Sequence, residues 1–334
     1  MTPSEVPATG PANPSTVDDP VIQVDGLTKR YGELTALRPV EFEVRRGDVF
    51  GVLGPNGAGK TTLVEMLEGL VDPSGGSASV LGLDIRRDLD ELKQRIGVQL
   101  QASSYHRYLT LVEILELFGS FYRRSVDPME LLERVRLQDR ASSRIGQLSG
   151  GMAQRFSIVA ALVNEPEIVF FDEPTAGLDP DARRDLWELV LDVRARGATV
   201  VLTTHYMEEA ETLCDRVAFL NAGEIVAMDT PQALVRTLHA PYRVELLTSE
   251  ALDVSRVTEL EGTRDVSTEQ RTDGHVLRLN AEHAPDVIRR MEVLARERGA
   301  EVLDLTVRAA TLEDVFLSLT GQTLTAAADG ETGT

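Results

Sequence analysis

The residues with the clearest chemistry form a glycine-rich run near position 60. The run matches G-x-x-x-x-G-K-[ST] at every fixed position and reads Gly54-Pro55-Asn56-Gly57-Ala58-Gly59-Lys60-Thr61. Its glycines let the backbone turn N–H groups toward phosphate oxygens, and the start of a following helix adds partial positive charge. Lys60 can then reach the β- and γ-phosphates of a nucleoside triphosphate, while the Thr61 hydroxyl binds Mg²⁺. We call this run the phosphate loop, and it predicts a nucleoside triphosphate site.

The segments on both sides of the phosphate loop have the character that the motif requires. The apolar run 49–53 precedes it and reads as a strand, and Thr62 begins a helix-like segment that extends to position 67. A glycine-rich turn that only joins a strand to a helix is the alternative interpretation. The complete motif and its correct flanks favour nucleotide binding.

A second apolar strand, 168–171, ends in two acids, Asp172 and Glu173. A buried strand would hold Asp172 still, so that it can bind Mg²⁺ directly or through water. Glu173 is placed to orient or deprotonate an attacking water, and Pro174 disfavours helix at that position. A strand with an acidic turn would explain the pattern alone, but the phosphate loop upstream favours a catalytic role.

A third motif follows Leu148 and contains Ser149, Gly150 and Gly151 at the start of an apparent helix. Ser149 can cap this helix, and the free N–H groups at its first turn form an anion site. The chain thus carries two phosphate-binding devices, and one nucleotide cannot easily occupy both within a single fold. A head-to-tail pair of subunits, each completing the other's site, is the simplest arrangement.

With these motifs, residues 20–240 resemble the ATP-binding cassette (ABC) family. Residues 148–152 resemble its LSGGQ signature, although Met152 stands where Gln is commonest. The resemblance implies that Tyr31 stacks on adenine, where packing beside a strand end is the alternative. It implies that Gln101 contacts Mg²⁺ and water, with Gln99 as a nearby competitor on the same strand face.

Two more residues take roles from the same resemblance. Asp179, in Gly177-Leu178-Asp179, matches a loop that lies across the dimer interface, and His205 matches a histidine that senses the γ-phosphate. His205 ends an apolar strand, which is where parallel α/β sheets place ligands. The implied activity is hydrolysis of ATP with Mg²⁺, and the implied catalytic residues are Glu173, His205 and Gln101.

Length and composition suggest a two-domain globular protein. The chain has 334 residues, of which 42% are hydrophobic and 26% charged. Cys214 is the only cysteine, so no intrachain disulfide can form, and a reducing cytoplasm fits. The net charge of −20 argues against binding to nucleic acid or bare anionic lipid.

The order of apolar runs predicts the architecture. Strands alternating with helices indicate an α/β nucleotide-binding domain over 20–240, with a helical subdomain at about 89–160. Short strands are expected at 21–24 and 41–44, with a turn-rich segment between them. Residues 241–321 have the order β-α-β-β-α-β and predict a small ferredoxin-like accessory domain. Tails 1–19 and 322–334 are predicted to be disordered.

The terminal segment 311–321 and the segment 205–211 resemble the daunorubicin-resistance type of exporter ATPase. Leu312, Val315, Phe316 and Leu319 fall on one helix face. That face could bind a partner subunit, but packing within its own accessory domain is the favoured interpretation. Residues 105–108 form a polar-aromatic stretch that suits a permease contact, although a solvated loop explains it equally well.

The resemblance implies an ATP-hydrolysing subunit that powers a separate integral-membrane permease. No run approaches the roughly 18 apolar residues of a membrane span, so the subunit would lie on the cytoplasmic face of the cell membrane and dimerise through its ATP sites. Export of drug-like or other hydrophobic compounds is expected. The alternative is a non-transport ABC ATPase acting on nucleic acid or ribosomes, and a second rival holds ATP without turnover. One cassette and intact Asp172, Glu173 and His205 disfavour both.

Overall fold

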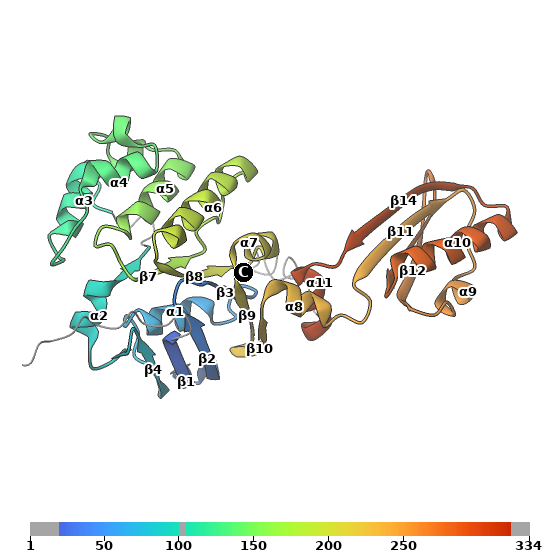
Figure 1. Ribbon diagram of the computed structural model, residues 1–334, viewed down its shortest axis with the longest axis horizontal. Coiled ribbons are helices and arrows are strands. Elements are labelled where there is room, and N and C mark those ends of the chain that lie inside the picture. The colour runs from blue at the N-terminus through green and yellow to red at the C-terminus, as the bar shows by residue number, and fades with distance from the viewer. Residues whose placement is uncertain (1–19, 100–104, 322–334) are drawn as a thin grey trace, which may run out of the picture.

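The computed structural model describes residues 20–99 and 105–321, and its central element is a six-stranded sheet (Figure 1). The strand order is β10-β9-β3-β8-β7-β6, in which only β10 is antiparallel to its neighbour. The strands are β3 (Val49–Leu53), β6 (Ile96–Val98), β7 (Ile168–Asp172), β8 (Thr199–Thr204), β9 (Arg216–Asn221) and β10 (Glu224–Asp229). Strands β3, β7 and β8 are almost wholly buried, as expected for parallel strands covered on both faces.

An antiparallel sheet covers one face of this central sheet. Its order is β2-β1-β4-β5, formed by β1 (Pro20–Tyr31), β2 (Leu34–Arg45), β4 (Gly75–Val80) and β5 (Leu83–Asp84). Helix α1 (Lys60–Leu67) lies between the two sheets, and Phe42 stacks on Phe50 with ring centroids 5.4 Å apart. The prediction of a turn-rich segment between two short strands is wrong. The strands β1 and β2 instead form one long hairpin, which turns at Gly32 with φ +60°.

Helices cover the opposite face of the central sheet. They are α3 (Leu111–Gly119), α4 (Pro128–Arg134), α5 (Gly150–Ala160), α6 (Pro180–Ala195) and α7 (Met207–Leu213). Helix α2 (Leu89–Arg95) precedes β6, and short 3₁₀ turns occupy Gln138–Arg140 and Ile145–Gln147. Each of the helices α3, α4 and α5 begins with a side-chain cap, from Thr110, Asp127 and Ser149 respectively.

A second, smaller unit follows helix α8 (Pro231–Arg236) and projects from residues 20–236, the part expected to be an ABC cassette and called the cassette below (Figure 1). It contains β11 (Tyr242–Thr248), α9 (Val254–Thr258), β12 (Thr263–Arg271), β13 (Gly274–Ala281), α10 (Ala284–Arg298) and β14 (Val302–Ala309). The antiparallel strand order is β12-β13-β11-β14. Helices α9 and α10 pack on one face of this sheet and build a separate core with Val244, Leu246 and Leu277.

Helix α11 (Leu312–Thr320) corrects one expectation. Its apolar face does not pack within the C-terminal unit, because Leu312, Val315 and Phe316 are buried in the core of the cassette. The Phe316 ring meets the edge of Phe219 on β9 at 5.5 Å, and the Leu312 N–H donates to Glu211 Oε1 of α7 at 2.6 Å. The chain thus returns from the C-terminal unit and anchors on the core beside β9.

Removal of the Phe316 ring should destabilise the cassette. We expect Phe316→Ala to lower the free energy of unfolding by about 3–5 kcal/mol, because it empties a fully buried site. Urea titration followed by Trp187 fluorescence measures it. The matched control is Leu319→Ala on the same helix, where the side chain is 48% exposed and the expected change is within about 0.5 kcal/mol. Equal losses in both variants would contradict the docking of α11.

Within the part of the chain that the structure describes, no helix has both the length and the apolar character needed to cross a membrane.

Candidate nucleotide site

A cavity of about 930 Å³ opens where three parallel strands end. The phosphate loop follows β3. Asp172 is the last residue of β7 and Glu173 follows it, while His205 follows β8. Because β3, β8 and β7 are neighbours in the sheet, these residues converge at its carboxyl edge. The cavity is lined by backbone or side chains of Tyr31, Leu34, Asn56, Gly57, Gly59, Lys60, Thr61, Thr62, Gln99, Gln154, Asp172, Glu173 and Ala222, among others.

The phosphate loop requires glycine at two positions where other backbone approaches closely. A Cβ at Gly54 would lie 2.1 Å from the Leu220 carbonyl oxygen on β9. A Cβ at Gly59 would lie 2.6 Å from the Ala36 carbonyl oxygen, and Gly59 also has φ +104°. Strands β2 and β9 therefore hold the loop from two sides. Pro55 and Ala58 lie between these points, and Ala58 accepts a hydrogen bond from the Gly223 N–H.

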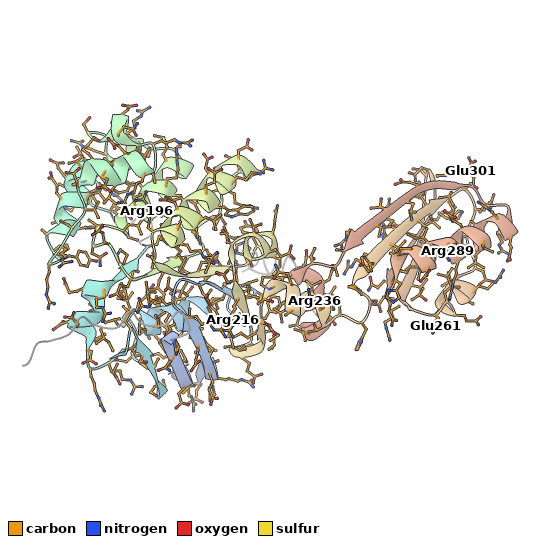
Figure 2. The ribbon with its side chains drawn as sticks, viewed as in Figure 1. Arg196, Arg216, Arg236, Glu261, Arg289 and Glu301 are labelled. Carbon is orange, nitrogen blue, oxygen red and sulfur yellow. The ribbon has the colours of Figure 1, made fainter. Side chains whose placement is uncertain are left out.

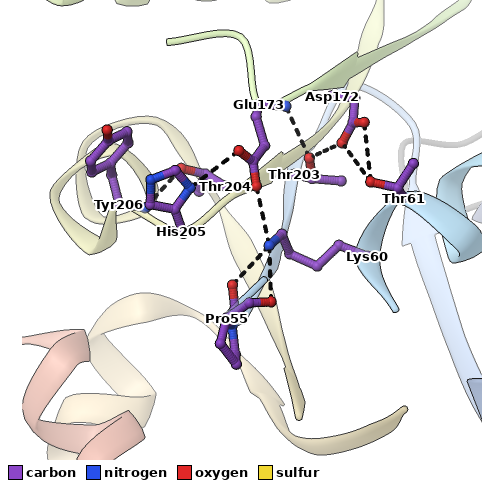
Figure 3. Close-up of polar contacts among 10 residues, drawn as sticks. Pro55, Lys60, Thr61, Asp172, Glu173, Thr203, Thr204, His205 and Tyr206 are labelled. Carbon is purple, nitrogen blue, oxygen red and sulfur yellow. Dashed lines mark hydrogen bonds and ion pairs between the residues drawn. The ribbon is translucent and has the colours of Figure 1, made fainter. Parts of the chain in front are cut away.

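Lys60 is held inside the loop with its charge satisfied by oxygen atoms. Its side chain is only 5% exposed, and Nζ donates to the carbonyl oxygens of Gly54 at 2.9 Å and Pro55 at 3.2 Å. Nζ also lies 3.2 Å from Glu173 Oε1 (Figure 3). The Lys60 ammonium thus lies inside the phosphate loop, where phosphate oxygens can replace the oxygen atoms that now contact it.

Glu173 connects the phosphate loop to the residue after β8. Its Oε2 lies 3.3 Å from His205 Nδ1, while its Oε1 contacts Lys60 (Figure 3). The neighbouring His205 ring and the Lys60 ammonium lower the pKa of Glu173 to about 2, so the carboxylate is ionised at neutral pH. Glu173 has φ +46°, an unfavourable conformation for a non-glycine residue that the Thr203 carbonyl and hydroxyl hold by accepting its N–H.

Asp172 and Thr61 form an oxygen-rich group suited to Mg²⁺. Thr61 Oγ1 lies 3.2 Å from Asp172 Oδ2, and the Thr203 hydroxyl holds Asp172 Oδ1 from the next strand (Figure 3). Among the residues that the structure describes, no group of three or more His, Cys, Asp or Glu could hold a metal by itself. One carboxylate and one hydroxyl are what Mg²⁺ needs when substrate phosphates supply the other ligands, so these residues fit the ion.

Gln99 lies in the cavity wall, whereas Gln101 lies outside the described residues. Gln99 Nε2 donates to Ser157 at 3.2 Å, and its Oε1 is buried with no hydrogen-bond partner in the described structure. A buried amide oxygen without a partner is uncommon and suits a missing cation or water. Of the two glutamines expected to compete for the contact with Mg²⁺ and water, Gln99 is the one that the structure describes at the cavity.

Tyr31 and Leu34 form an exposed apolar platform at one end of the cavity. The Tyr31 ring is 46% exposed, and Lys29 Nζ lies 4.8 Å from its centroid. Exposed ring surface in a cavity wall suits stacking on a purine. Leu34, which the sequence did not single out, lies across the hairpin turn and extends this platform.

The second phosphate-binding device lies apart from the cavity of its own chain. Ser149 caps α5 by accepting the Met152 N–H at 3.3 Å, and neither Gly150 nor Gly151 lines the cavity. Asp179 likewise caps α6 and lies outside the cavity wall. The Met152 side chain packs against the helical core. The structure therefore places Ser149, Gly150, Gly151 and Asp179 away from the residues of the phosphate loop.

Glu68, which sequence reasoning missed, is a buried acid near Asp172. Burial, then the charges of Asp172 and Glu65, raise the pKa of Glu68 to about 8. The folded chain thus keeps a proton that the unfolded chain releases above about pH 4.5, and its stability falls as the pH rises from there to about 8. No motif marks Glu68, which is the residue just after the end of helix α1.

Replacement of Glu68 by glutamine should remove the loss of stability that occurs between about pH 4.5 and pH 8. We expect Glu68→Gln to raise the free energy of unfolding by about 3 kcal/mol at pH 8 and to change it little at pH 5. Thermal unfolding at both pH values, without nucleotide or magnesium, measures the effect. Glu116→Gln, which changes an exposed helical glutamate, is the control. An equal shift at pH 5 and pH 8 would show that the carboxyl group is not the cause.

Comparisons with known proteins agree with this geometry. The model of the ABC transporter family matches residues 37–176. The chain is 38% identical over 315 residues to the daunorubicin resistance ATP-binding protein DrrA2 of Streptomyces coeruleorubidus, covering 91% of this chain and 96% of the relative. It is 36% identical to the Nod factor export ATP-binding protein I of Rhizobium leguminosarum bv. viciae, covering 93% and 98%.

Solved structures resemble the cassette portion. An ATP-binding subunit of an ABC transporter superposes with a TM-score of 0.60 at 32% identity, covering 65% of this chain and 92% of that one. A dimeric ATP-binding cassette in a post-hydrolysis state, bound to ADP and Pi, gives a TM-score of 0.57 at 27% identity and covers 63% and 98%. These likenesses confirm the predicted α/β fold class of the nucleotide-binding core.

Proposed function

This chain belongs to the family of ABC transporter ATP-binding subunits, and from that premise we propose that it powers the export of drug-like or other hydrophobic compounds. It binds and hydrolyses ATP, as the family does. The observation that carries the export proposal is the likeness to a daunorubicin resistance protein over 91% of the chain. That likeness extends well past the family model, into the C-terminal unit. Neither relative reported above is named for an action on nucleic acid or ribosomes.

The geometry supports a specific division of labour among the site residues. Lys60 holds the β- and γ-phosphates, and Tyr31 stacks on the base. Asp172 and Thr61 would hold Mg²⁺, which supplies positive charge beside the phosphates when it is bound. A water oxygen bonds to the γ-phosphorus, the bond to the β,γ-bridging oxygen breaks, and Glu173 accepts the proton of the water.

The ion pairs around Glu173 explain why ATP must arrive before this residue can act. A carboxylate with a pKa of about 2 is a poor base at neutral pH, since it holds a proton weakly. When Lys60 turns to the phosphates, Glu173 loses its ammonium neighbour and keeps the contact with His205 Nδ1 at 3.3 Å. Its pKa then rises, and the carboxylate becomes a better proton acceptor beside the γ-phosphate.

The position of the second phosphate-binding group, at the start of α5, supports a head-to-tail homodimer. Ser149, Gly150 and Gly151 lie outside their own chain's cavity, so a second copy is the natural source of this group for each ATP. The dimeric solved cassette resembles this core. ATP binding would draw two copies together, and hydrolysis would release them.

A small pocket that begins next to Gln99 suits an apolar side chain on a helix of the permease. It has a volume of about 230 Å³ and is lined by Val98, Tyr105, Phe118, Phe121, Tyr122, Ala160 and Ala161. Tyr105 is buried, and its ring contacts Phe118 and Phe156. Phe121 and Tyr108 are exposed large aromatic side chains. Because the pocket includes Val98, next to Gln99, movement there would be linked to the ATP site. We assign the subunit to the cytoplasmic face of the cell membrane.

Capture of the tagged chain from gently solubilised native membranes tests the export proposal. A polytopic membrane protein enriched with Glu173→Gln over the wild type, and lost with Phe121→Glu, is the expected result. Loss of that membrane protein from the cells should then raise intracellular drug accumulation. Enrichment of ribosomal or DNA-bound proteins instead would overturn the proposal.

A further inference from the structure

The C-terminal sheet has two free edges, and one of them is more regular than the other. The order β12-β13-β11-β14 leaves β12 and β14 each unpaired on one side within the described residues. Such an edge presents backbone N–H and C=O groups to any other strand, so natural edges usually carry charges or bulges. Figure 2 labels Glu261, just before β12, and Glu301, just before β14, on opposite borders of the unit.

Strand β12 carries the usual protection. Its register against β13 is broken between Arg264 and Ser267, and Asp265 in this break has φ +52°. Glu269 and Arg271 add charge near its end. This edge is therefore irregular and polar, and it is poorly suited to pairing.

Strand β14 has one register shift, between Val302 and Asp304, and two charged residues, Asp304 and Arg308, but the rest of its edge is regular. Its register against β11 is continuous from Asp304 to Ala309, and the strand contains no proline or glycine. The side chains of Leu303 and Val307 are 47% and 41% exposed. A regular strand with exposed apolar side chains is a site for strand addition.

The hydrogen-bond direction along β14 follows from one contact beyond its end. The Ala310 N–H donates to the Pro241 carbonyl at 2.7 Å, in the same register as the strand pair. Alternate residues of an antiparallel strand direct their backbone groups to the same side. Residues 304, 306 and 308 therefore bond to β11, whereas 305, 307 and 309 direct their N–H and C=O groups to the free edge.

We propose that this edge pairs with β14 of a second copy of the chain, antiparallel about a two-fold axis at Thr306. Thr306 then lies opposite itself, and Leu305 lies opposite Val307 of the partner subunit. Leu305 and Val307 both direct backbone groups outward, so they can exchange hydrogen bonds as this register requires. The two four-stranded sheets become one eight-stranded sheet.

Charge complementarity selects this register and this partner. Asp304 lies opposite Arg308 of the partner subunit, and the two-fold axis makes the pair occur twice. Asp304 has no ion pair among the described residues, while Arg308 contacts Asp314 at 3.3 Å and retains further donors. An axis at Leu305 or Val307 would place Asp304 or Arg308 opposite Thr306 and pair no charges. A strand that complements itself favours a second copy over a strand of the permease.

The contact needs no nucleotide, because none of its residues lines the ATP cavity. It would keep two chains together after ATP hydrolysis opens the cassettes. That consequence rests on the proposed function, but the strand pairing itself does not.

Disulfide trapping of the full chain without nucleotide tests the register directly. In the proposed register Thr306 and its copy form a non-hydrogen-bonded antiparallel pair. The Cα atoms of such a pair are about 4.5 Å apart, which a disulfide can bridge. Under mild oxidation, Thr306→Cys should give a covalent dimer, and the native Cys214 is buried. Gln270→Cys on β12 is the matched control and should remain monomeric. Equal cross-linking of both variants, or cross-linking of Thr306→Cys only to a membrane protein, would overturn the proposal.

Sedimentation of the uncross-linked protein gives the second measurement. Asp304→Arg should raise the dimer dissociation constant by about tenfold or more, because it opposes like charges twice. Asp273→Arg, in the turn before β13, makes the same charge change away from the edge and should leave the constant unchanged. Val307→Pro removes only an outward N–H and should also dissociate the dimer while the fold is retained. A wild type that stays monomeric without nucleotide refutes the pairing, and ATP hydrolysis by that monomer would leave the proposed function standing.

Discussion

Lys60→Ala should lower the rate of ATP hydrolysis by about 10³-fold or more and weaken nucleotide binding. Among the described residues that line the cavity, Lys60 alone carries a positive charge, and Gly54, Pro55 and Glu173 hold its ammonium. Its charge stabilises the negative charge that develops as the γ-phosphoryl group transfers, and such contacts contribute several kcal/mol to catalysis. Steady-state hydrolysis and equilibrium binding of ATP measure the two effects.

The control for this variant is Lys93→Ala, which removes an exposed lysine on α2. Both variants change the net charge of the chain equally, so a general electrostatic effect would appear in both. Wild-type turnover in Lys60→Ala would refute the assignment of the phosphate loop. A folded Lys60→Ala protein is expected, since Glu173 loses the ion pair with Lys60 but keeps its contact with His205 Nδ1 at 3.3 Å.

The sequence predicted the site residues that depend on local pattern. The phosphate loop, Asp172, Glu173 and His205 each follow an apolar strand, and parallel strands bring their carboxyl ends to one edge. Short segments of the sequence were thus enough to infer both the chemical role of these residues and their position at the edge of the sheet. Thr203 was missed because its role depends on lying beside Asp172 on the next strand, a contact that no short segment contains.

Long-range packing was predicted less well. The apolar face predicted for α11 is buried at three positions, whereas Leu319 is exposed. An apolar face also does not reveal which core will cover it. Its anchor, Glu211, lies 101 residues before Leu312 in the chain. The long β1–β2 hairpin was missed because Gly32 and Pro39 suggest turns. Pro39 is tolerated since β2 is the edge strand of its sheet, where a missing N–H breaks no ladder on the free side.

Glu173→Gln should retain ATP binding but lose turnover by about 10²- to 10⁴-fold, because the amide cannot accept the proton of the attacking water. Its affinity for ATP should equal or exceed that of the wild type. In the absence of nucleotide the ionised Glu173 occupies Lys60, and ATP must break this ion pair before its phosphates can take the lysine. A neutral glutamine competes less strongly for the same ammonium and does not repel the phosphates.

The bound ATP that accumulates should hold two copies of the chain together, since each Ser149 group lies outside its own cavity and is available to a partner. In chains that carry Asp304→Arg, which removes the contact through β14, sedimentation velocity with ATP and magnesium should therefore show an ATP-dependent dimer for Glu173→Gln that Asp304→Arg alone forms only transiently. The dependence on ATP separates this contact from one through β14, which Asp304→Arg removes. Glu208→Gln changes an exposed glutamate on α7 and should behave as the wild type does. If Glu173→Gln carrying Asp304→Arg stays monomeric at ATP concentrations well above its dissociation constant, ATP does not clamp two isolated subunits, and the permease must supply the missing contacts.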